Sequence, residues 1–75
     1  MSSSARDTQI LNALTYASVA THDQNGTYGP RRFARDLGFT TAAVKASLKR
    51  LVAAERVTFF QPSPDSAFYY HPTGK

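Results

Sequence analysis

The chain has 75 residues and a mass of 8.2 kDa, enough for one domain that buries about 60% of its unfolded surface, which excludes a large substrate cavity. It has no cysteine, so disulfides and thiolate zinc sites are excluded, and 41% hydrophobic residues indicate a globular chain. Nine basic and five acidic residues leave a net charge of +4, which favours a polyanionic partner. No apolar run reaches the length of a membrane span or forms a signal peptide, so we expect a soluble protein of the cytoplasm or nucleoid.

The first element that the pattern predicts is a helix over residues 5–20. Ser4, with Asp7 three residues later, is typical of a capping box that places an acid at the positive end of the helix dipole. Apolar residues recur at helical spacing and form one stripe: Ile10, Leu14 and Ala17. We therefore expect a structural helix.

Residues 21–29 have the composition of a loop, and the pair Asn25 and Gly26 favours a turn because both residues tolerate a positive φ. Pro30 then stands where a second helix begins, at a position whose missing N–H costs nothing. Gly38 ends this helix, as glycine does where the backbone turns left-handed. The residues expected on its inner face are Phe33, Ala34 and Leu37.

A third helix is predicted from the cap residue Thr40 to about residue 54. Its apolar seam repeats at intervals of four and three: Val44, Leu48 and Leu51. The opposite face is therefore expected to point to solvent, and it carries Thr41, Ala42, Lys45, Ala46 and Lys49. These side chains are free to meet a partner.

After Glu55 the pattern changes from helical to extended. Residues 57–60 and 67–70 are rich in β-forming side chains, and the prolines and serines of residues 62–66 predict a turn between them. The sequence therefore predicts a single α+β domain over residues 5–71, with flexible tails at residues 1–4 and 72–75.

All of the net positive charge lies in the centre of the chain. Residues 31–56 carry a local charge of +5, whereas the remainder sums to −1. The basic side chains of this block are Arg31, Arg32, Arg35, Lys45, Lys49, Arg50 and Arg56. The block coincides with the second and third predicted helices.

The order helix, loop, short helix, tight turn, helix and hairpin resembles the winged helix-turn-helix superfamily of DNA-binding domains. The run over residues 33–51 is similar to the family pattern. Ala34 is small where two helices cross, Gly38 supplies the turn, and Phe39 pins the third helix on the second. The resemblance implies three helices followed by a β-hairpin wing, with the third helix in a major groove.

Carried over position by position, the resemblance implies that the groove-facing residues are Thr40, Thr41, Ala42, Lys45, Ala46 and Lys49. It also implies phosphate contacts from Arg31 and Arg32, with Arg50 and Arg56 as further candidates. The groove-facing set holds no Arg, Asn or Gln, so bidentate base readout is absent and we expect modest specificity with a large electrostatic share of affinity. Double-stranded DNA is the expected partner.

The hairpin departs from a typical DNA-binding wing, because its turn holds Asp65 and no basic residue. Adjacent aromatic residues place rings on both faces of the hairpin, since successive strand residues point to opposite sides. We expect Phe60, Tyr69 and Tyr70 to form a dimer or partner surface. A protein-docking module, for example one that binds a polymerase or nuclease complex, and an RNA-binding module remain alternatives.

Catalysis has no support in the sequence. His22 and His71 are far apart, and no motif places a base beside a nucleophile. We expect no enzymatic activity, cofactor, metal or small-molecule ligand. The function expected from the sequence is that of a small transcriptional regulator acting as a dimer.

Overall fold

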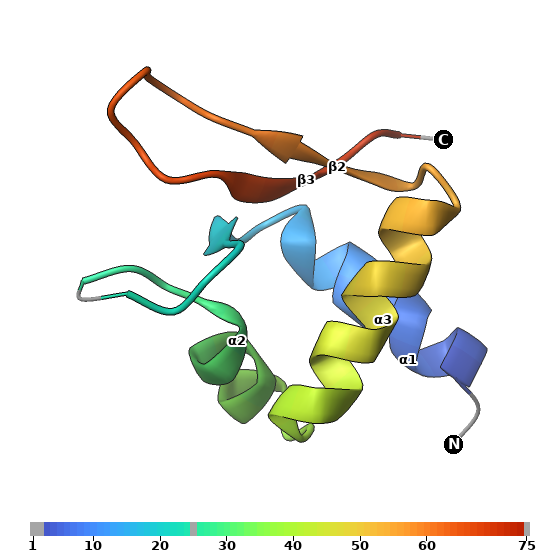
Figure 1. Ribbon diagram of the computed structural model, residues 1–75. Coiled ribbons are helices and arrows are strands. Elements are labelled where there is room, and N and C mark those ends of the chain that lie inside the picture. The colour runs from blue at the N-terminus through green and yellow to red at the C-terminus, as the bar shows by residue number, and fades with distance from the viewer. Residues whose placement is uncertain (1–2, 25, 75) are drawn as a thin grey trace.

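Six regular elements follow one another in the computed structural model, which describes residues 3–24 and 26–74. They are α1 (Ser3–Leu14), β1 (Val19–Ala20), α2 (Pro30–Leu37), α3 (Thr41–Ala53), β2 (Val57–Phe60) and β3 (Tyr69–Pro72). The strands form a three-stranded antiparallel sheet in the order β1-β3-β2, which lies at the C-terminal ends of α1 and α3 (Figure 1). The predicted α+β class is confirmed by the three helices and the antiparallel sheet. None of the helices in the described ranges is long and apolar enough to cross a membrane.

The first helix is shorter than predicted, because α1 ends at Leu14 and not at residue 20. The N–H groups of Thr15 and Tyr16 bond to carbonyls three residues back, which tightens and closes the helix. Val19 and Ala20 then pair with β3, so long-range strand pairing overrides the helical pattern.

The start of α1 also corrects a prediction. The helix begins at Ser3, so Ser4 lies inside it, where its carbonyl accepts a hydrogen bond from Thr8 Oγ1. The expected capping box between Ser4 and Asp7 is therefore wrong, and Asp7 contacts α3 instead.

The boundaries of α2 match the prediction. Pro30 is its first residue, and Gly38 follows its last with φ 78° in the left-handed region. Gly29 is the N-cap residue and has no side chain to accept a capping hydrogen bond. The carboxylate of Asp23 accepts one instead from the Arg31 N–H, at 3.2 Å. A Cβ on Gly29 would lie 2.1 Å from Asp23 Oδ1, so only glycine fits there. Gly26 has the positive φ expected for the predicted turn, whereas Asn25 lies outside the described residues.

Both ends of α3 are fixed by local hydrogen bonds. Thr40 Oγ1 accepts from the Ala43 N–H at 3.1 Å, which confirms Thr40 as the N-cap. At the other end, Glu55 adopts φ 60° and the Arg56 N–H bonds to the Leu51 carbonyl, as in a Schellman motif. The chain thereby reverses directly from α3 into β2.

One hydrophobic core joins the helices to the sheet. It contains predicted inner residues of all three helices, together with one residue from each of β1 and β2: Ile10, Leu14, Val19, Phe33, Ala34, Val44, Leu48, Leu51 and Val57. Ala17, which was expected on the inner face of the first helix, lies after the end of α1 and only packs against the core. Leu37, Phe39 and Tyr70 pack against it while staying partly exposed. Because α3 contributes three of these side chains, the core fixes which of its faces points to solvent.

The second strand of the hairpin begins two residues later in the chain than the sequence predicts. β3 covers Tyr69–Pro72, and Phe60 lies opposite Tyr69 in the register. Beyond β3, Thr73 donates from its N–H to the Arg56 carbonyl and from Oγ1 to the Glu55 carbonyl. The regular elements run from Ser3 to Pro72, compared with the expected domain limits of residues 5 and 71.

Candidate nucleic-acid interface

The outer face of α3 is exposed as the sequence predicts. Ala42, Lys45, Ala46 and Lys49 point to solvent, whereas Val44, Leu48 and Leu51 are buried on the opposite side. The two lysines stand four positions apart, one helical turn, with alanines beside them. A surface of this kind lets another molecule approach the helix backbone closely between two positive charges.

The two threonines at the start of α3 differ in their exposure and in their hydrogen bonds. Thr40 is exposed, but its hydroxyl oxygen already accepts the capping bond from Ala43. Thr41 lies half-buried in the first turn of the helix. Thr40 therefore has a structural role in addition to its expected place on the interface.

The remaining basic side chains surround α2 and the end of α3. Arg31 and Arg32 are exposed in the first turn of α2, which lies beside the N-terminal half of α3 (Figure 1). Arg56 is exposed where the chain enters β2. In the described part of the chain, the only ion pair joins Arg50 and Asp7, so these three arginines and both lysines lie outside it.

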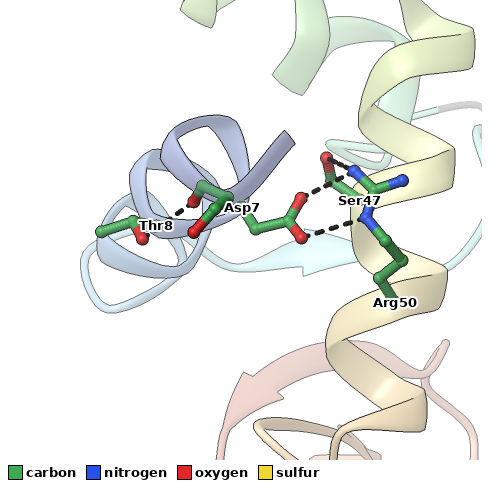
Figure 2. A network of polar contacts seen from close by, with 5 residues as sticks. Asp7, Thr8, Ser47 and Arg50 are labelled. Atoms are coloured by element: carbon green, nitrogen blue, oxygen red, sulfur yellow. Dashed lines mark hydrogen bonds and ion pairs between the residues drawn. The ribbon is translucent and has the colours of Figure 1, made fainter. Parts of the chain in front are cut away.

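Arg50 differs from the other expected DNA contacts, because its guanidinium is paired with side chains of the same chain (Figure 2). Nε donates to Asp7 Oδ2 at 3.0 Å, and Nη2 donates to Asp7 Oδ1 at 2.8 Å and to Ser47 Oγ at 2.9 Å. These bonds satisfy the buried Ser47, lower the pKa of the Asp7 carboxyl and raise the pKa of Arg50. Arg50 therefore ties α1 to α3, while its side chain stays 44% exposed at the surface.

A second contact from α1 supports the turn before α3. The guanidinium of Arg6 stands 5.6 Å from the ring centroid of Phe39, within cation–π range. Together with the Asp7–Arg50 pair, it ties α1 both to the α2–α3 turn and to the C-terminal half of α3. Arg6 and Arg50 therefore both help to hold α3 in place against α1.

Two carboxylates that the sequence did not single out also have internal roles. Asp23 caps α2, and Asp36 accepts a short hydrogen bond from the Tyr28 hydroxyl. Burial, and then the contact with Asp36, raise the pKa of Tyr28 to about 12. Tyr28 also meets Phe33 edge-on, with ring centroids 6.3 Å apart. No local pattern links positions eight apart across a loop and a helix start, so the sequence offered no signal for this pair.

The hairpin separates the three aromatic residues that were expected to share a surface. Phe60 and Tyr69 are register partners and lie on the outer face of the sheet. Tyr70 lies on the opposite face, half-buried against the core, with its ring 5.7 Å from that of Phe59. Tyr70 therefore points to the other face of the sheet, although all three residues border one groove at the end of α1.

Three exposed rings were not assigned to any surface by the sequence. Tyr16 is 91% exposed, and Phe59 and Phe68 are 52% and 50% exposed. Tyr16 borders a groove of about 800 Å³ at the end of α1, which is also lined by Phe60, Tyr69, Tyr70 and His71 of the hairpin. Phe59 and Phe68 lie on the face that carries Tyr70.

Within the described ranges, no three His, Cys, Asp or Glu side chains lie close enough to hold a metal ion. Comparison of the chain with protein-family models, with curated proteins and with solved structures found no significant match.

Proposed function

We propose that this chain is a winged helix-turn-helix domain that binds double-stranded DNA through the outer face of α3. The observation that carries the proposal is the exposed stripe of Ala42, Lys45, Ala46 and Lys49, which contains no acidic side chain. The order of α2, turn, α3 and hairpin is compatible with this layout, and the core and the Asp7–Arg50 pair hold α3 in a fixed orientation.

The chemistry of the stripe suits a major groove. A groove about 12 Å wide admits a helix, and alanine methyls keep the helix surface narrow. Lys45 and Lys49 donate to phosphate oxygens or to guanine O6 and N7, while Arg31, Arg32 and Arg56 supply further phosphate contacts at the edges. With no bidentate side chain on the stripe, affinity depends mainly on charge, and base specificity is modest.

As a regulator of transcription, the domain acts as a dimer on two half-sites. The outer hairpin face supports this part of the proposal, since Phe60 and Tyr69 line an open groove together with the exposed Tyr16. The same surface favours the second candidate function, docking of a different protein. Sedimentation of the free chain and of its DNA complex separates the two, because a chain that stays monomeric in both contradicts the dimer.

The test of DNA binding is a titration of mixed-sequence duplex at low salt. Lys45→Ala/Lys49→Ala removes the charges of the stripe without touching the core, and we expect a loss of affinity of at least tenfold. Lys45→Arg/Lys49→Arg is the matched control and keeps the binding, because the charges remain. Absence of duplex binding by the wild type, or equal binding by the alanine variant, contradicts the proposal.

A further inference from the structure

The lysines of α3 lie next to aromatic rings of the hairpin. Lys45 and Lys49 line a hollow of about 230 Å³ together with Phe59 and Tyr70. The sequence alone places no basic residue among the aromatic residues of either strand. The fold supplies that missing charge from a different element.

A second hollow continues the first along the hairpin. It has a volume of about 310 Å³ and is lined by Phe59, Phe68 and Tyr70, with Thr21 and His22 at its other side. Because Phe59 and Tyr70 belong to both hollows, the rings form one continuous aromatic strip, defined here as Phe59, Phe68 and Tyr70. No acidic side chain lines either hollow.

The strip is suited to flat, apolar surfaces that carry negative charge nearby. Phe59 and Phe68 each expose about half of their surface, so a ring stacked on them removes apolar area from water. Bases in a duplex have their faces covered by neighbouring pairs, whereas unpaired bases present free faces. The phosphates of such a strand meet Lys45 and Lys49 at the edge of the strip.

We propose that the aromatic strip binds unpaired nucleotides of a DNA strand that continues from the duplex held by α3. This inference rests on the proposed function and deepens it: the preferred substrate is a duplex with a single-stranded extension, not a blunt duplex. The rings stack on the bases, and the two lysines neutralise phosphates where the strand leaves the duplex.

The experiment compares a blunt duplex with the same duplex carrying a single-stranded extension on either strand. Because stacking of one base contributes roughly tenfold in affinity, we expect the wild type to prefer the extended DNA by about that factor or more. Phe59→Ala/Phe68→Ala abolishes the preference and leaves blunt-duplex binding unchanged. Phe60→Ala is the matched control, since Phe60 is also 52% exposed but lies on the opposite face.

A direct readout uses the fact that the chain contains no tryptophan. In a Phe59→Trp variant the single indole reports on the strip, and we expect its fluorescence to be quenched by extended DNA and not by blunt duplex. Phe60→Trp is the control, and its fluorescence should not differ between extended DNA and blunt duplex, because position 60 lies on the opposite face.

The outcomes separate the two proposals. If the wild type binds blunt and extended DNA equally, or if Phe60→Ala loses as much preference as Phe59→Ala/Phe68→Ala, the strip proposal is overturned while duplex binding stands. If the double variant converts a dimer to a monomer and keeps the preference for extended DNA, the strip is a protein interface and the proposal is also overturned. Failure to bind blunt duplex at all overturns the proposed function instead.

Discussion

The outer face of α3 and the aromatic strip meet at the hollow between Lys49 and Phe59, yet they expose different chemistry. α3 presents lysines separated by alanines, so its attraction for a polyanion weakens as salt screens the charges. The strip presents half-exposed rings, whose stacking depends on contact area and depends little on salt. We therefore expect a salt-sensitive and a salt-insensitive contribution to DNA binding, which mutations can separate.

The change expected to break both regions at once is Leu48→Ala. Leu48 is 1% exposed on the inner face of α3, and its loss leaves a cavity beneath the helix. We expect the free energy of unfolding to fall by ~2–5 kcal/mol, measured by urea denaturation. Lys49→Ala, one position away on the outer face, is the control and should change stability by less than ~0.5 kcal/mol. Equal effects of the two variants contradict the orientation of α3.

A smaller effect is expected from loosening only the N-terminus of α3. Thr40→Ala removes the hydroxyl that accepts from the Ala43 N–H, and we expect a loss of ~1 kcal/mol in the free energy of unfolding. Thr40→Ser keeps the acceptor and should retain most of the stability. If the alanine variant is as stable as the wild type, the cap contributes nothing. The aromatic strip should be unaffected, so the preference for extended DNA persists.

The smallest effect, and the one that depends on pH, concerns the Asp7–Arg50 pair. Because the pKa of Asp7 is lowered from 3.8 in the folded chain, the carboxylate stabilises the fold above that pH, and this contribution is lost as pH falls through the lowered value. Asp7→Asn should therefore reduce stability near neutral pH and flatten its decline in acid, measured by thermal unfolding between pH 2 and about 7.

The control for this titration is Asp65→Asn, which removes a carboxylate from the hairpin turn, outside the ion pair. It should leave the acid limb of the stability curve as steep as in the wild type. An unchanged acid limb in Asp7→Asn would mean that the pair has no part in fixing α1 on α3.

The α2–α3 segment was predictable from the sequence because its signals act over a few residues. Pro30, Gly38 and Thr40 each set a helix boundary through their own backbone or a bond to the next turn. The helical repeat of Val44, Leu48 and Leu51 then determined which side of α3 is buried. The cationic stripe follows directly from that assignment.

The other parts depend on contacts between distant positions. Arg50 was expected to meet DNA, but its partner Asp7 stands 43 positions away, and no local pattern announces the pair. Which rings share a face of the hairpin is decided by register, here Phe60 opposite Tyr69 and Phe59 opposite Tyr70. The sequence alone does not determine that register, so it predicted exposed aromatic residues without showing which of them share a face.

The most direct test of the central claim is the salt dependence of duplex binding by the wild type and by Lys45→Ala/Lys49→Ala. Each phosphate contact adds about −0.9 to the slope of log affinity against log salt concentration, so removal of both lysines should make the slope shallower by roughly 1.8. Phe59→Ala/Phe68→Ala should leave the slope of blunt-duplex binding unchanged. If the slope is the same with and without the two lysines, α3 does not present its outer face to DNA.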